Sequence, residues 1–195
     1  MKMQEKKLKR FRVYEVIANV LFILILVTGG LALLAAIGGE IAISVTNLDI
    51  AGLAERMVTT YVPAITIPEM PTNAFFHTLI IGAIAAGAVG LAFICYLFKA
   101  VSNLFANIVK TETPFHEKSI RILKSIGISF FIYTALMFLI GGTFSGVLSS
   151  LYPLGTFNID TSLKLSTIIY GLLILALAEI FEFGASLQQD NESIV

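Results

Sequence analysis

The chain has 195 residues, of which 57% are hydrophobic and 13% are charged, and its mean hydropathy is +0.90. Such a composition excludes an ordinary water-soluble surface and indicates a membrane protein. Thirteen basic residues balance thirteen acidic ones, so the net charge predicts no direct nucleic-acid partner. The single cysteine, Cys95, excludes an intrachain disulfide and is expected to pack among its apolar neighbours.

Four apolar runs meet the requirement of about 20 residues for crossing the hydrocarbon core of a bilayer. They cover about residues 13–43, 76–98, 122–148 and 165–183, and the second is expected to continue as a helix to residue 109. The first run is longer than the bilayer core, so it should tilt or project from it. It is also too long for the apolar region of a cleavable signal peptide, so we expect a retained helix. The predicted fold class is all-α, an integral membrane four-helix bundle.

Lysine and arginine are distributed unevenly among the segments that flank these runs. Eleven of them precede the first run or lie between the second and third, whereas only Arg56 and Lys164 lie in the other two connections. Because positive charge resists translocation, both termini and the central connection are predicted to be cytoplasmic. The expected localisation is the cell membrane, with several passes and with connections 44–75 and 149–164 outside.

The first outside connection changes character along its length. Residues 47–59 are expected to form a short helix at the membrane interface. Residues 61–72 contain three prolines and alternating β-branched residues, which predict an extended segment.

Small residues recur at intervals of four in the second run. They are Gly82, Ala86 and Gly90. Such a stripe lets helix backbones approach closely within lipid, so it predicts packing inside the bundle. A homodimer face and a substrate cleft remain alternatives.

The cytoplasmic connection between the second and third runs, residues 99–121, is called the hinge. Its polar part, TETPFHEKSIRILKSIG, begins at Thr111. Thr113 is a good N-cap and Pro114 suits a first helical turn, so a short amphipathic helix is predicted to begin at Pro114. The residues of this predicted hinge motif are Thr113, Pro114, Phe115, Leu123, Ile126 and Gly127.

Charged residues near the predicted cytoplasmic ends of the runs form a second candidate site. They are Glu15, Lys99, Lys124, Glu179 and Glu182. Charges at this depth are costly and are usually paired, so a belt of ion pairs joining the helix ends is predicted. A proton- or cation-coupled site is the alternative, although Glu40 lies too near the outer end of the first run to supply it.

The chain lacks the phosphate-binding, dinucleotide-binding, HExxH and CxxC motifs that would indicate an enzyme or a metal protein. Its two histidines, His77 and His116, are predicted to lie on opposite sides of the membrane and so cannot share a metal. No catalytic, cofactor-binding or metal site is therefore predicted.

Two regions of the chain resemble the DUF2975 family of small bacterial and archaeal four-helix membrane proteins of unknown function. The first is the hinge pattern of Pro114-Phe115, a polar cap and then Leu123, Ile126 and Gly127; the second is the tail, with Ala178-Glu179, Gly184 and Leu187-Gln188 before a short acidic segment. Ser119 and Thr113 depart from residues that are frequent in the family. The resemblance implies a sensing or regulatory role, since members are thought to be encoded beside a small helix-turn-helix regulator.

The predicted function is that of a non-enzymatic membrane protein that contacts another protein through its cytoplasmic hinge and its tail, residues 184–195. A transporter or channel subunit working as a homo-oligomer is one alternative, and a membrane-embedded enzyme is the other. No cofactor is expected, and the bilayer itself is the expected surrounding.

Overall fold

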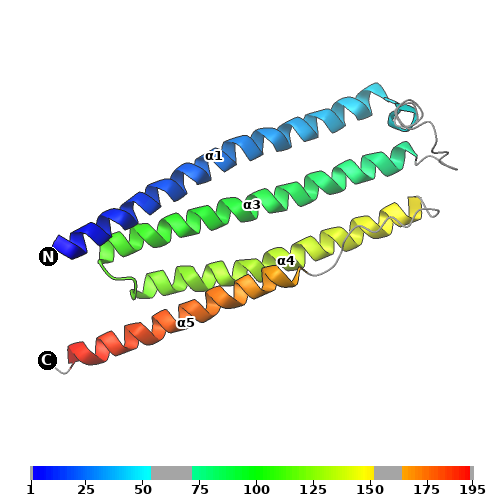
Figure 1. Cartoon of the computed structure of the whole chain (residues 1–195). Helices are drawn as coiled ribbons and strands as arrows, with labels where there is room; N and C mark the ends of the chain where they lie inside the picture. The colour runs from blue at the N-terminus through cyan, green and yellow to red at the C-terminus, as the bar shows by residue number, and fades with distance from the viewer. Residues whose placement is uncertain (1, 54–71, 152–163, 194–195) are drawn as a thin grey trace, which may run out of the picture. The chain divides into compact units, whose positions relative to one another are not determined.

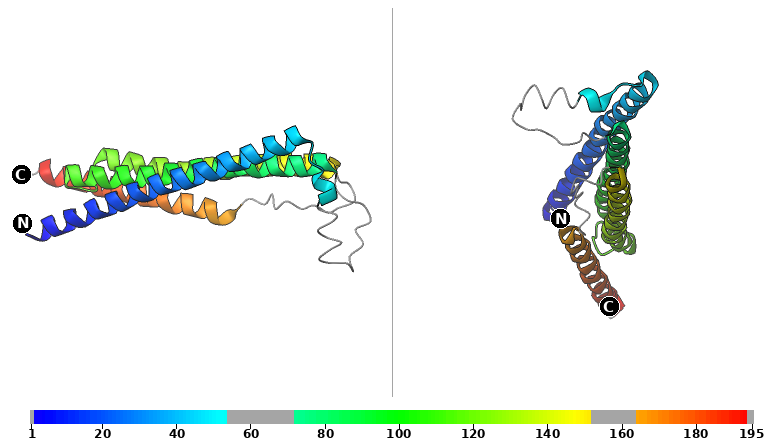
Figure 2. Two further views of the ribbon diagram at one scale, coloured as in Figure 1. Left: turned by 90° about the horizontal axis from the view of Figure 1, so that it is seen from above. Right: turned by 90° about the vertical axis from the view of Figure 1, so that its right-hand side faces the viewer.

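The computed structural model describes residues 2–53, 72–151 and 164–193, and it is built from helices (Figure 1). The long helices are α1 (Lys2–Thr46), α3 (Asn73–Thr111), α4 (Glu117–Leu151) and α5 (Leu165–Ser193). All four are long and apolar enough to cross a membrane, so the chain is a multi-pass membrane protein. Each predicted run lies within one of these helices, and each helix is continuous from end to end in the two further views of Figure 2.

Helix α3 is the clearest case of a helix longer than the bilayer. Its 39 residues extend about 58 Å at a rise of about 1.5 Å per residue, roughly twice the thickness of the hydrocarbon core. The expected continuation to residue 109 is confirmed, because the helix ends at Thr111. Glu112 follows with a φ of 56°, the left-handed conformation that ends many helices.

The chain forms two compact units, which are described separately. Unit 1 consists of Met1–Gly30, Gly90–Ala135 and Leu163–Val195, and unit 2 consists of Leu31–Val89 and Leu136–Ser162. Parts of α1, α3 and α4 occur in both units, whereas α5 belongs to unit 1.

The core of unit 1 is made by α3, α4 and α5. The ring of Phe93 in α3 stacks on Tyr133 of α4 with centroids 4.2 Å apart, and Phe130 meets Phe93 edge-on at 5.1 Å. Cys95 is buried and free, in keeping with an inert packing role. Helix α1 contributes little to this core, since Ala18 is its only buried apolar residue among those described.

Unit 2 is held by fewer buried side chains. Phe75 at the start of α3 is 2% exposed, and Leu148 near the end of α4 is 1% exposed. The turn after α1 is tied to α3, because the Oδ1 atom of Asn73 accepts a hydrogen bond from the amide of Ala51 at 2.8 Å. A helical turn at residues 50–53 falls within the short helix predicted for residues 47–59, while the proline-rich segment 61–72 lies almost entirely outside the described residues.

Candidate functional site

The segment between α3 and α4 is a pair of turns followed by a helix start. The hydroxyl of Thr113 accepts a hydrogen bond from the amide of Phe115 at 3.2 Å, so it closes a turn instead of capping a helix. Helix α4 begins at Glu117, so the predicted start at Pro114 is wrong. The cap is provided by His116, whose Nδ1 accepts a hydrogen bond from the amide of Lys118 at 3.1 Å. The predicted amphipathic turns therefore form the first turns of α4.

Phe115 attaches this segment to α5. Its ring meets Phe181 edge-on, with centroids 5.6 Å apart, and it lies where a Cβ atom on Gly184 would be. Gly184 thus leaves the space that the ring of Phe115 occupies. The two regions that carry the family resemblance, the hinge and the tail, are in direct contact through this ring.

A buried polar pair holds the segment from the other side. The Nδ2 atom of Asn107 in α3 donates a hydrogen bond of 2.8 Å to the hydroxyl of Ser119 in α4. Ser119 is fully buried and Asn107 is 7% exposed, so water does not compete for this bond. This pair could not be predicted from sequence, because helical spacing does not show which residues of two different helices face each other.

The predicted belt of charge is present in part, as a cluster of three residues between α4 and α5. The Nζ atom of Lys124 lies 3.0 Å from Oε1 of Glu179 and 2.5 Å from Oε2 of Glu182. Glu179 and Glu182 are three residues apart on one helix face, so both reach the same lysine. The structure does not bring the other two predicted members into this cluster.

Glu15 and Lys99 form no ion pair with any residue that the structure describes. The ammonium group of Lys99 instead lies over the ring of Phe22, 5.6 Å from its centroid. A cation over an aromatic face keeps part of its electrostatic stabilisation without a carboxylate. Lys99 and Lys124 were both expected near the cytoplasmic ends of the runs, but that position does not show that they face different neighbours.

We predict that the triple cluster stabilises the contact of α4 with α5 only while Lys124 keeps a carboxylate partner. Replacing both glutamates with glutamine should lower the melting temperature in detergent by a few degrees, because Lys124 then has no carboxylate partner. Adding Lys124→Gln should restore part of the loss, whereas adding Lys99→Gln should not. The loss is expected to be modest, since all three side chains are at least a third exposed. Equal effects of the two lysine substitutions would contradict the cluster.

The predicted stripe of small residues in α3 is only partly used for packing. A Cβ atom on Gly82 would meet the ring of Phe144 in α4, and Ala86 lines a cavity of about 260 Å³ between the same helices in unit 2. A Cβ atom added to Gly90 would have no neighbouring atom within 4 Å among the described residues. A closer approach occurs in unit 1. A Cβ atom on Gly127 would lie 3.1 Å from the carbonyl oxygen of Gly171, and a Cβ atom on Gly171 would lie 3.1 Å from the carbonyl oxygen of Gly127.

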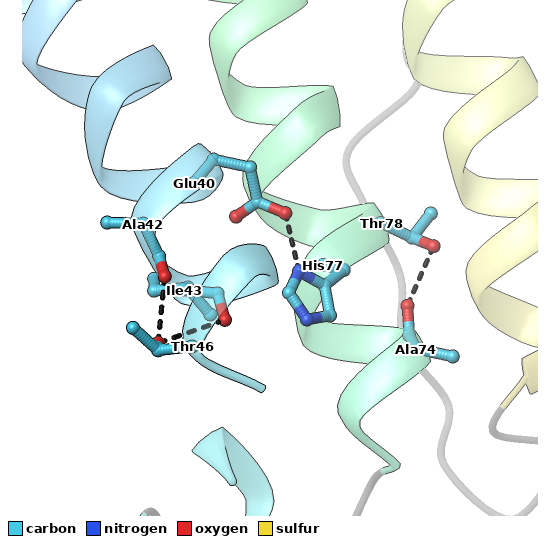
Figure 3. Close-up of polar contacts among 7 residues, drawn as sticks. All are labelled: Glu40, Ala42, Ile43, Thr46, Ala74, His77 and Thr78. Carbon is cyan, nitrogen blue, oxygen red and sulfur yellow. Dashed lines mark hydrogen bonds and ion pairs between the residues drawn. The ribbon is translucent and has the colours of Figure 1, made fainter. Parts of the chain in front are cut away.

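A second polar site, which the sequence reasoning missed, lies in unit 2. The Nδ1 atom of His77 in α3 is 2.5 Å from Oε1 of Glu40 in α1, and the two side chains face each other in Figure 3. The sequence placed both residues near the outer ends of adjacent runs. That shared level is the available signal for a contact, whereas the sequence reasoning considers His77 only as a metal ligand and Glu40 only for the inner site.

The beginning of α4 also carries a group of exposed charged residues. His116, Glu117, Lys118 and Arg121 are all exposed. Arg121 pairs with Glu117 one turn earlier at 2.6 Å, and Lys118 has no carboxylate partner among the described residues. In this part of the molecule a buried polar pair and a docked aromatic ring thus support a charged surface.

The family model described as "Protein of unknown function (DUF2975)" matches residues 54–195, well over half of the chain. The match includes both the hinge and the tail, so it confirms the resemblance noted from those motifs. No curated protein and no solved structure matches the chain.

Proposed function

Because the chain belongs to the DUF2975 family, whose function is unknown, we propose from its geometry that it is a non-enzymatic membrane protein with a regulatory or sensing role. It acts by binding a protein partner through the hinge–tail surface, which we define as the exposed side chains at the start of α4 and at the end of α5. These residues are His116, Glu117, Lys118, Arg121, Gln188 and Gln189.

The observation that carries this proposal is the way the hinge is fixed. A simple connection between two membrane helices needs no buried polar pair, yet Asn107 and Ser119 form one beneath the hinge. The ring of Phe115 also docks against Gly184 in the tail. A hinge whose backbone is already held in place loses less conformational entropy on binding than a mobile one, which favours a specific partner.

The side of the membrane is part of the proposal. The excess of lysine and arginine in the N-terminal segment and in the hinge favours a cytoplasmic position for the hinge–tail surface. The partner is then a cytoplasmic protein or the cytoplasmic part of another membrane protein.

Two features support this role over the alternatives. A transporter needs polar groups along a path, whereas the cavity of about 460 Å³ between α1 and α3 of unit 1 is lined by apolar and aromatic residues such as Ile17, Leu97 and Phe105. A membrane-embedded hydrolase needs converging acid, base or metal-binding groups. Within the described ranges, no group of three histidine, cysteine, aspartate or glutamate side chains could hold a metal ion.

The test is site-specific photo-crosslinking in intact cells. A crosslinking amino acid at Lys118, in the hinge–tail surface, should give a discrete product with a second protein. The same amino acid at Ile132, which is exposed farther along α4, should give none. Adding Glu117→Gln and Arg121→Gln should remove most of the Lys118 product because the charged surface is changed. Identical products from both positions, or no product from Lys118, would contradict the proposal.

A further inference from the structure

The contact between Glu40 and His77 leaves one carboxylate oxygen without a partner. Side-chain exposure is 12% for Glu40 and 28% for His77, and the pair bridges α1 and α3 inside unit 2. The Oε2 atom of Glu40 is buried and has no hydrogen-bond partner. A buried acceptor of this kind is unusual in a folded protein and calls for a physical reason.

Neighbouring hydroxyl groups do not provide that partner. The hydroxyl groups of Thr46 and Thr78, which are also drawn in Figure 3, each bond within their own helix. The hydroxyl of Thr46 donates to the carbonyl of Ala42 at 2.8 Å, and that of Thr78 donates to the carbonyl of Ala74 at the same distance. Neither hydroxyl group therefore donates a hydrogen bond to the Oε2 atom of Glu40.

Few other ionisable side chains occur in the described part of unit 2. Across the described part of unit 2, Asp49 has the only other ionisable side chain, and its Oδ1 accepts the amide of Gly52 at 3.0 Å. The portion of α4 in this unit contributes no ionisable group. Among the residues that the structure describes in unit 2, His77 is the ionisable side chain that contacts Glu40.

We propose that Glu40 and His77 form a proton-binding site that regulates the contact between α1 and α3, and that the Oε2 atom of Glu40 receives the proton. While Glu40 is ionised its oxygens can only accept, so Nδ1 of His77 carries the hydrogen between them. In acid, one proton from water binds Oε2 and the carboxylate becomes a neutral carboxylic acid. No other covalent bond changes.

Protonation changes the strength of the bridge between the helices. A hydrogen bond between an imidazolium and a carboxylate is about twice as strong as one between neutral groups. Once Glu40 is neutral, the ion pair is lost and the remaining bond holds α1 to α3 less firmly. The bridge depends on the negative charge of Glu40, so uptake of a proton by this carboxylate makes the contact between α1 and α3 sensitive to acid. This proposal does not depend on the partner at the hinge–tail surface.

The chain allows a direct test, because it contains only two histidines. Histidine-labelled protein in lipid nanodiscs should give two NMR signals, with His116 as an exposed internal control. We expect Glu40→Gln to change the titration curve of His77 and to leave that of His116 unchanged. Glu117→Gln, at an exposed glutamate of α4, should leave the titration curve of His77 unchanged. An identical His77 curve in the wild-type protein and in Glu40→Gln would overturn the proposal.

Two further measurements identify the proton and its effect. Infrared difference spectra of the wild-type protein in acid should contain a carboxylic acid band that Glu40→Gln removes and Glu117→Gln keeps. Spin labels on cysteines replacing Ile41 and Ile81, with Cys95 changed to alanine, should show a wider distance distribution in acid. Retention of the infrared band in Glu40→Gln, or label distances independent of pH, would reject the site. If Glu40→Gln fails to fold, His77→Asn takes its place, with loss of the pH-dependent distance as the expected result.

Discussion

Replacing Gly127 with valine is expected to lower the free energy of unfolding by about 3 kcal/mol, at the upper end of the usual cost of overpacking. Gly127 and Gly171 bring the backbones of α4 and α5 into direct contact in unit 1. A Cβ atom on Gly127 would collide with the side chain of Leu175 and would lie 3.1 Å from the carbonyl oxygen of Gly171. Leu175 can change its rotamer, but a backbone carbonyl within a helix cannot move aside without separating the helices.

Thermal unfolding in a fixed detergent measures this effect. For a chain of this size, each kcal/mol corresponds to about 2–4 °C in melting temperature, so a drop of about 6–12 °C is expected. Gly142→Val is the matched control, because Gly142 lies on the same helix with nothing within 4 Å of its Cβ position. Both substitutions place a β-branched residue in α4, so the difference between them isolates the close contact. Equal losses would disprove the packing role of Gly127.

Removing the hydroxyl of Ser119 should also destabilise unit 1, by about 1–3 kcal/mol, because the buried amide of Asn107 then loses its acceptor. The hydrogen bond of 2.8 Å between them lies where Ser119 is fully buried. Replacing both residues with apolar ones, as in Asn107→Leu with Ser119→Ala, should be less harmful than Ser119→Ala alone.

A double-mutant cycle on melting temperature checks this second prediction. Ser149→Ala provides the control, since the hydroxyl of Ser149 is exposed and bonds only to the carbonyl of Ser145 one turn earlier. Its removal should have little effect. If the two single substitutions at Asn107 and Ser119 were additive in the double variant, the pair would not be coupled.

The four helices were predictable from sequence because a chain within lipid must satisfy its backbone hydrogen bonds internally. Length and hydropathy then determine where the helices run, which is why the predicted runs fall inside α1, α3, α4 and α5. The ending of α3 beyond the apolar run was also predictable, from its continuing helical pattern.

The partners of individual residues were less predictable. Helical spacing shows which residues share a face, but not which helix lies opposite that face. For this reason the small residues of α3 were chosen as the packing stripe, while the closest backbone contact occurs at Gly127 and Gly171. Lys124 was correctly grouped with Glu179 and Glu182, whereas Lys99 has the same kind of charge and faces Phe22.

The start of α4 shows a different limit. Thr113 and Pro114 are favourable helix-start residues, but the hydroxyl of Thr113 bonds to Phe115 two residues later and stabilises a turn. The hydrogen bond of Thr113, the cap at His116 and the contact of Phe115 with α5 all favour the turn and the later helix start. The sequence contains the local signals for both outcomes, and the contact with α5 adds to those of the turn.

The dependence of Glu40 on His77 has a consequence for how the chain is made. The two residues are 37 positions apart, so ribosomes working at about 5–20 residues per second add Glu40 about 2–7 seconds before His77. During that interval the carboxyl group of Glu40 cannot pair with His77. We therefore expect α1 to remain near the insertion machinery until α3 follows, so that the two helices leave it together.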